Sequence, residues 1–422
     1  MTSLAERLRG VIRPDSPAGA EAPRLQPPDY AADTLGGQWH EAAGHRCLVV
    51  DRTYKPGHRH GRAVVCDAAP ENGTWPRLGL LRGDQVVRRS VAAQERLLFV
   101  DLETTGLAGG AGTYAFLVGC GWFDGPLFRV RQFFLSSFAA ERLLLAAVAE
   151  LAADATGVVT YNGKSFDLPL IETRYLLHRM TTPFAALPHV DMLHPARRLW
   201  KSEEQEVEGE SSCKLTVLER TLFGHEREGD VPGFEIPARY FNYVRSGDAR
   251  PLEAVLEHNR LDLLSLAFFT AHAATLLDEG PAAARTAREA LGMGRLYERG
   301  GMTGEATASY SRAVDLPGEP VTHADALRSY AVLARRERRY GAAADAWRRL
   351  LEMRNCPPQL AREATDALAV HHEHRQRDLE SARQFALRSL QLHETASLRQ
   401  AVEHRLARLN RKLGLESAAA LF

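Results

Sequence analysis

Two acidic residues directly after an apolar run are the first candidates for chemistry in this chain. Asp101 and Glu103 stand two residues apart and follow the apolar residues 97–100. Residues i and i+2 of a β-strand point to the same face, so both carboxylates are expected to project side by side from the end of one strand. They repel each other unless a cation lies between them, and hard divalent cations such as Mg²⁺ or Mn²⁺ prefer oxygen ligands. The spacing therefore predicts either a metal site or a strand end with two solvated acids.

Further acids stand in two later segments, each with a structural explanation of its own. Asp167 ends the sequence Y-N-G-K-S-F-D and is expected to open a helix, where an Asp caps free N–H groups. His258 and Asp262 are spaced i and i+4, and therefore lie on one face of a helix predicted for residues 252–277. Taken alone, this pair is a helix-surface His–Asp contact.

The elements that must position these residues predict an α/β domain over residues 96–278. Strands are expected at 97–102, 114–122, 128–135, 158–161 and 189–193, and helices at 139–153 and 168–179. Short turns between the first three strands indicate an antiparallel meander. The resulting order, β-β-β-α-β-α-β-α, is the order of an RNase H-like fold, a mixed sheet flanked by helices.

The combination of motifs resembles the DEDD superfamily of RNase H-like 3′–5′ exonucleases. D-x-E on a first strand, N-G-x-x-F-D at a strand–helix junction and H-x-x-x-D on a late helix occur in one order. Within that superfamily the chain looks most like the YprB-type branch, in which such a domain precedes helical repeats. The resemblance covers residues 35–278 and, more loosely, the helical residues that follow.

The resemblance implies a two-metal phosphodiester hydrolase. The ligands of two divalent ions, Mg²⁺ or Mn²⁺, would be Asp101, Glu103, Asp167 and Asp262. Two such ions about 3.5–4 Å apart stabilise the attacking and leaving oxygens. His258 would orient or deprotonate the attacking water.

The spacing of the histidine departs from the family pattern. The usual His-type members have the His five residues before the last Asp, and the Tyr-type members have a Tyr four before it. Here His258 stands four residues before Asp262, and Glu257 stands five before it. Two roles for His258 stay open, a general base or a residue that orients Asp262.

Four residues near the acids are candidates for substrate contact. They are Thr104, Asn162, Lys164 and Phe166. Phe166 could stack on a terminal base, and a core position is the alternative. The glycine-rich residues 106–113 could let a nucleic-acid backbone approach closely, but they lack the Gly-Lys-Ser/Thr ending of a P-loop.

Three other segments flank the predicted nuclease domain. Residues 1–34 are expected to form a mobile arm, and residues 35–95 a small β-rich extension with strands at 47–50, 63–66 and 78–81. Histidines and cysteines in that extension have no standard zinc spacing. Residues 282–422 have the small and aromatic spacing of a tetratricopeptide-like (TPR-like) helical repeat, with an irregular helical bundle as the alternative.

Composition limits the classes of function. The formal net charge is zero, so a nucleic-acid partner would need a local basic surface rather than bulk charge. Five scattered cysteines without C-x-x-C spacing indicate a reducing compartment. Neither a signal peptide nor an uninterrupted apolar run of membrane-spanning length is recognised, and the expected localisation is cytoplasmic.

Two classes of function follow. The first is a metal-dependent 3′–5′ exonuclease that acts on single-stranded DNA or RNA. The alternative is a non-catalytic nucleic-acid or protein-binding scaffold on an RNase H-like fold. The helical tail, which carries arginines between residues 335 and 339, could bind a protein partner or nucleic acid in either case.

Overall fold

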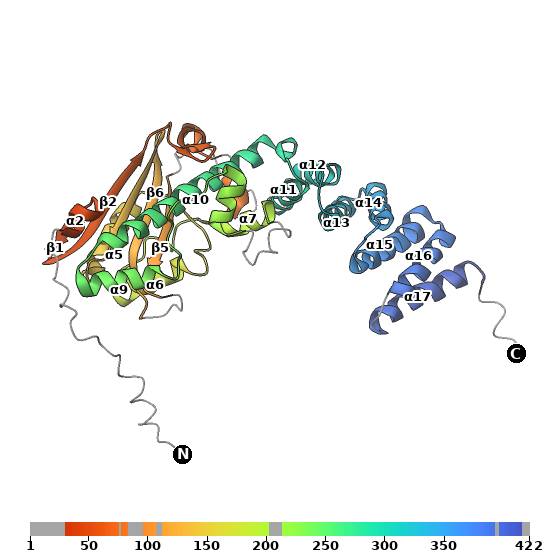
Figure 1. The fold of residues 1–422 in the computed structure, drawn as a ribbon. Helices are drawn as coiled ribbons and strands as arrows, with labels where there is room; N and C mark the ends of the chain where they lie inside the picture. Colours follow the sequence, from red (N-terminus) through yellow and green to blue (C-terminus); the bar gives the residue numbers. More distant parts are fainter. Residues whose placement is uncertain are drawn as a thin grey trace, which may run out of the picture.

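A seven-stranded mixed sheet forms the body of the molecule, and a row of helices extends from it to the C-terminus (Figure 1). The computed structural model describes residues 30–75, 77–82, 96–106, 112–201, 213–392 and 396–415. The sheet order is β1 (Gln38–Ala42), β2 (His45–Tyr54), β7 (Leu127–Phe134), β6 (Ala115–Asp124), β5 (Leu97–Thr104), β8 (Gly157–Thr160) and β9 (His189–Asp191). Strands β5, β8 and β9 are mutually parallel, and the other pairs are antiparallel. The predicted fold class is confirmed.

Alternation along β5 separates two cores on the two faces of the sheet. Leu98, Val100 and Leu102 belong to a core that also contains residues of α5 (Glu141–Ala152), α6 (Asp167–Leu177) and α9 (Ile236–Ser246). Leu97 and Phe99 belong to a second core with α10 (Glu253–Glu279). Because side chains alternate along a strand, Asp101 and Glu103 share the face of Leu97 and Phe99, which is the face that α10 covers.

Helix α10 is apolar because it is a central core helix. It forms the greater part of a helical stretch, Arg250–Glu279, that is long and apolar enough to cross a membrane by length and composition. However, 72% of its apolar window is buried inside the fold. Its apolar surface is therefore used within the α/β body, against the sheet.

The N-terminal residues extend the central sheet. After α2 (Tyr30–Leu35), strand β2 pairs antiparallel with β7 from Leu48↔Phe134 to Tyr54↔Phe128. The expected strand at 47–50 is thereby confirmed within β2. The rest of the predicted arm, residues 1–29, lies outside the described residues.

Two other strand predictions in this segment are wrong wholly or in part. Residues 63–66 contain only the short strand β4 (Ala63–Val64), paired with β3 (Arg59–His60), before helix α3 (Val65–Ala68) begins. Residues 78–81 lie in a helix, α4 (Leu78–Arg82). Its three leucines are all buried, and α4 contacts β9, α10 and α11. A strand would put neighbouring Leu80 and Leu81 on opposite faces, whereas a helix turns both toward the core.

Short helical turns connect the larger elements. They are η1 (Glu71–Gly73), η2 (Phe138–Ala140), η4 (Glu219–Phe223), η5 (Arg250–Leu252), η6 (Pro281–Ala283) and η7 (His372–Gln376), together with helices α7 (Leu193–Leu199) and α8 (Leu215–Leu218).

The C-terminal helices pack each against the next. They are α11 (Ala287–Arg299), α12 (Thr303–Asp315), α13 (Pro320–Arg336), α14 (Tyr340–Glu352), α15 (Pro358–His371), α16 (Leu379–Leu392) and α17 (Ala396–Lys412). The first pair meets closely, because a Cβ at Gly294 would overlap the ring of Tyr310. This small–aromatic contact agrees with the spacing noted in the sequence, and assignment to the TPR class stays a prediction.

A buried ion pair joins α5 to α6. Arg174 Nε and Nη2 donate to the two carboxylate oxygens of Glu141, each at 2.6 Å, and both side chains are buried. His178 Nε2 lies 2.7 Å from the same carboxylate. The pair helps to fix α6, whose first residue is Asp167.

We expect Glu141→Ala to lower the free energy of unfolding by about 3–5 kcal/mol, because it leaves Arg174 buried without its charge partner. Chemical denaturation measures the change. Asp51→Ala is the matched control, because Asp51 also forms a two-bond pair, with Arg131, but an exposed one. The control should cost less than about 1 kcal/mol, and equal losses in the two variants would contradict the assignment.

Candidate functional site

Asp101 on β5 is held by an amide from α10. Asn259 Nδ2 donates to Asp101 Oδ2 at 2.7 Å and to the Asp101 backbone carbonyl at 3.1 Å. In turn, Gln132 Nε2 on β7 donates to Asn259 Oδ1 at 2.8 Å. The buried Asn259 therefore fixes the orientation of the first candidate acid.

A glycine makes this contact possible. Gly119 on β6 lies in register between Asp101 on β5 and Gln132 on β7. A Cβ at this position would overlap Asn259 Oδ1. The missing side chain lets α10 approach the sheet closely enough for its amide to reach Asp101.

Asp167 reaches β5 from the start of α6. The backbone N–H of Leu102, between Asp101 and Glu103, donates a hydrogen bond to the Asp167 carboxylate and lowers its pKa. Burial is the larger effect, and the pKa of Asp167 is raised to about 7. The third predicted acid is thus brought directly beside the first two.

Asp191 has a structural contact of its own nearby. Its carboxylate accepts the backbone N–H of Asn162 at 2.7 Å, of Lys164 at 3.0 Å and of Leu193 at 3.1 Å. Asn162 has a left-handed backbone, with φ of 66°. Asp191 therefore shapes the turn that leads into Asp167.

The candidate substrate residues lie beside these acids along the chain. Phe166 is 58% exposed, which excludes the core alternative, and Lys164 is exposed as well. Thr104 Oγ1 donates to the Gly106 carbonyl at 3.0 Å. The glycine-rich residues 107–111 lie outside the described part of the chain.

Asp262 and His258 are joined by two residues of a loop. Arg227 Nη2 lies 2.5 Å from Asp262 Oδ1, and His258 Nε2 lies 3.6 Å from Asp262 Oδ2. His258 Nδ1 is 2.6 Å from Asp230 Oδ1, and Arg227 Nη1 is 3.3 Å from Asp230 Oδ2. Glu257, five residues before Asp262, instead pairs with Arg260.

Mutual repulsion connects the four predicted acids. Burial raises the pKa of Asp101 well above its usual value, and the charges of Asp262, Glu103 and Asp167 raise it further. Burial likewise raises the pKa of Glu103, with the charges of Asp262, Asp167 and Asp230 adding to the effect. The charges of Asp167 from α6 and Asp262 from α10 thus act on both acids of β5.

Sequence reasoning missed Asn259, Gln132, Arg227 and Asp230. Asn259 stands between His258 and Asp262 in sequence. Its position in a helix that carries two candidate site residues could have indicated that it contacts the site. Arg227 and Asp230 belong to the run E-R-E-G-D, which reads as a solvated charged loop. Nothing in its spacing indicates that Arg227 is buried.

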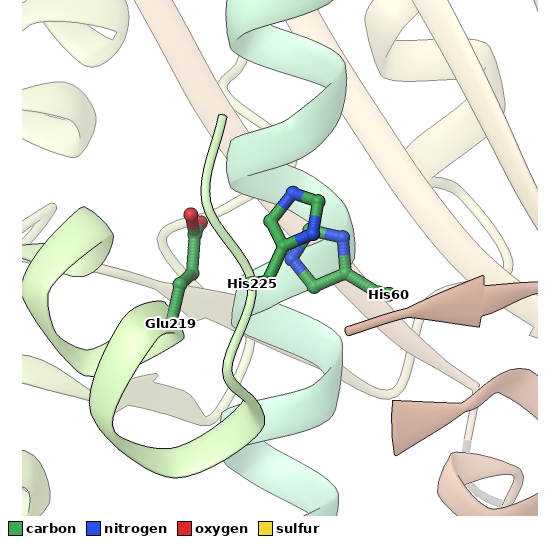
Figure 2. A group of neighbouring side chains, drawn as sticks. All are labelled: His60, Glu219 and His225. Atoms are coloured by element: carbon green, nitrogen blue, oxygen red, sulfur yellow. The ribbon is translucent and has the colours of Figure 1, made fainter. Parts of the chain in front are cut away.

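A second cluster of potential metal ligands includes Glu219, which pairs with Arg227. Within the described residues, the one group of three or more potential metal ligands with all ligand atoms within 4.8 Å of one another is His60, Glu219 and His225 (Figure 2). The four predicted acids do not meet this criterion.

A family model and one relative agree with the predicted superfamily. A family model described as the RNase_H superfamily matches residues 98–274. The chain is 30% identical over 370 residues to a protein named "Uncharacterized protein YprB" from Bacillus subtilis, with 87% of this chain and 86% of that protein covered. A family B DNA polymerase from Pyrobaculum calidifontis aligns with 59% of this chain and 30% of its own, at 12% identity and a TM-score of 0.35.

Removing one repelling carboxylate should stabilise the metal-free protein at alkaline pH. The pKa of Glu103 is raised in the folded state, so its ionised form costs stability as pH rises through that pKa, and the cost vanishes below the unfolded value. We expect Glu103→Gln to raise the thermal midpoint by at least about 2 °C at pH 8, and less at pH 5.

Glu257→Gln, next to the site on α10 but paired with Arg260, is the control and should show no such pH-dependent gain. Added Mn²⁺ should stabilise the unmodified protein more than Glu103→Gln. A midpoint of Glu103→Gln that is unchanged or lower at pH 8 would refute the repulsion.

Gly119→Ala should separate Asn259 from Asp101, because the new methyl group occupies the position of the Asn259 amide oxygen. We expect a loss of about 1–3 kcal/mol in the free energy of unfolding, measured by denaturation. Gly304→Ala, in α12 with nothing within 4 Å of its Cβ position, is the control and should be neutral or stabilising. Similar losses in both variants would argue against the close approach.

Proposed function

This chain belongs to the YprB-like branch of the RNase H-like superfamily, and on that basis we propose that it is a divalent-metal-dependent nuclease. More specifically, we propose a 3′–5′ exonuclease that hydrolyses single-stranded DNA or RNA. The observation that carries the proposal is the convergence of four acids from three different elements, in which the charges of Asp167 on α6 and Asp262 on α10 act on both Asp101 and Glu103 of β5.

The donor set suits a hard divalent cation. Burial and neighbouring negative charges raise the pKa values of these carboxylates, and a cation between them stabilises their ionised forms. All four candidate ligands offer oxygen, which Mg²⁺ and Mn²⁺ prefer over the softer ligands of zinc sites. Asp101, Glu103, Asp167 and Asp262 would hold the proposed two ions, which would supply a nucleophilic water and stabilise the leaving oxygen.

His258 is the proposed general base. Its Nδ1 lies 2.6 Å from an Asp230 carboxylate oxygen, and that contact favours the tautomer with the proton on Nδ1. The remaining nitrogen, Nε2, then carries a lone pair on the side of Asp262. A base in that position can take a proton from water near the acid cluster.

Single-stranded substrate is favoured by the exposed ring beside Asp167. Phe166 is 58% exposed, and an unpaired base can stack on such a ring whereas a base within a duplex cannot. The exposed Lys164 offers a cation for a phosphate group. In the helical tail, Arg336 and Arg339 already pair with Glu298 and Glu337, which weakens the case for a nucleic-acid clamp there.

We expect the protein with Mn²⁺ or Mg²⁺ to shorten 5′-labelled single strands into a ladder of products. Asp101→Asn and Asp262→Asn should each reduce the rate at least about 100-fold, because each removes a charged ligand. Denaturing gels of end-labelled DNA and RNA report substrate, polarity and processivity together.

Asp51→Asn, which alters an exposed acid on β2, is the control and should retain full activity. If Asp101→Asn degraded the strands as fast as this control, the proposal would be wrong. Absence of carboxylate-dependent Mn²⁺ binding in calorimetry would instead favour the non-catalytic scaffold.

A further inference from the structure

We propose that Arg227 is a positioning residue that sets the geometry of Asp262 and His258. This inference rests on the proposed metal-dependent function, and it adds a cation to a site that the family resemblance describes only by its acids and its histidine. Arg227 comes from the loop before α9, at a distance in sequence from every predicted ligand.

The side chains around Arg227 form a closed ring. Arg227 binds Asp262 Oδ1 through Nη2 and Asp230 Oδ2 through Nη1. Asp230 Oδ1 meets His258 Nδ1, and His258 Nε2 faces Asp262 Oδ2, which completes the ring. Arg227 therefore fixes one oxygen of each acid, and Asp230 fixes the His258 ring through Nδ1, so rotation of Asp262 or His258 breaks a contact with Arg227 or Asp230.

A buried carboxylate anchors the ring to the body of the protein. Arg227 Nε lies 2.8 Å from Glu219 Oε2, and its Nη2 lies 2.5 Å from Glu219 Oε1. The Arg227 side chain is only 3% exposed, and that of Glu219 is fully buried. Attraction to Asp262 and Glu219 outweighs the effect of burial and raises the pKa of Arg227, so it remains a fixed cation.

Ser265 donates a hydrogen bond to Glu219, and His60 in turn contacts Ser265. Ser265 of α10 donates its hydroxyl proton to Glu219 Oε1, and His60 Nε2 lies 2.8 Å from the same hydroxyl oxygen. Burial and neighbouring charges lower the pKa of His60 to about 3, so its ring is neutral. The chain of contacts thus runs from His60 through Ser265, Glu219 and Arg227 to Asp262.

The cluster in Figure 2 is better explained as this anchor than as a second metal site. Both Glu219 oxygens already accept hydrogen bonds from Arg227, and Oε1 accepts a further one from Ser265. The rings of His60 and His225 have centroids 3.8 Å apart and planes tilted by 30°, and His60 Nε2 is already within hydrogen-bond distance of the Ser265 hydroxyl.

The planar guanidinium is what this arrangement requires. It reaches Glu219, Asp230 and Asp262 with donors that point in fixed directions. A lysine ammonium carries the same charge, but as a compact group that cannot span three carboxylates in the same geometry. Exchange of Arg227 for Lys therefore separates the contribution of geometry from that of charge.

The test uses the full-length protein with Arg227→Lys. We expect the dissociation constant for Mn²⁺, measured by calorimetry, to rise about tenfold, because a ligating carboxylate that loses its orienting partner typically binds metal 10–100-fold more weakly. We also expect kcat for a 5′-labelled single strand to fall at least about tenfold while KM changes less than about twofold.

Arg408→Lys is the matched control, since Arg408 also donates two hydrogen bonds to one buried glutamate, Glu373, in the C-terminal helices. It should leave Mn²⁺ affinity within about twofold even if it lowers thermal stability. Equal effects of the two variants on Mn²⁺ affinity, or an unchanged affinity in Arg227→Lys, would overturn the positioning role.

If Arg227→Lys does not fold, Glu219→Gln provides the second variant, because it weakens the anchor without altering the ring. It should shift Mn²⁺ affinity in the same direction by at least about threefold, and no shift would overturn the proposal. Affinity for Mn²⁺ is independent of turnover. A protein that binds Mn²⁺ through Asp262 but cleaves no strand would therefore refute the nuclease assignment while still testing Arg227.

Discussion

Repulsion between partly buried carboxylates is the constraint on which the rest of this site depends. Asp101 and Glu103 leave β5 on the same face, and Asp167 reaches the Leu102 amide between them. Burial and mutual charge raise the pKa of all three. Such a cluster opposes folding unless other contacts compensate, and the two cores that sandwich β5 provide that compensation through apolar burial on both sheet faces. The repulsion between carboxylates is thus confined to one end of the sheet, where a bound cation would reduce it.

The close approach of α10 to the sheet serves both the core and the site. From Leu263 onward, the helix contributes its apolar side chains to the same core as Phe99. One turn earlier it presents Asn259 to Asp101, over the bare backbone of Gly119. The register of the strands and the packing of the helix therefore determine the position of the acid together. A change that alters either one is felt at the other, because interiors are packed too densely to absorb a shift of one methyl group.

Sequence patterns predicted the strand and the helix that depend on neighbouring residues, and missed the contacts between residues far apart in the sequence. The apolar run at residues 97–100 and the i, i+4 spacing of His258 and Asp262 are local signals, and β5 and α10 follow them. Residues 78–81 fail as a strand because four residues are too few to separate a buried strand from a buried helical turn. Asp101 and Asn259 are 158 residues apart, and Arg227 and Asp262 are 35 apart. Such pairings are set by tertiary structure, so no local spacing encodes them.

The unusual spacing of His258 has a structural explanation in the loop that faces it. A side chain four residues before Asp262 lies on the same helix face as Asp262. A side chain five residues before Asp262 points more than a quarter turn further round the helix axis. Glu257 occupies that second position and pairs with Arg260. His258 instead meets Asp230, and Arg227 binds Asp230 and Asp262 together. An acid and an arginine from outside the helix thus supply the orientation that helix register alone does not, which makes the loop at residues 227–230 as much a part of the site as α10.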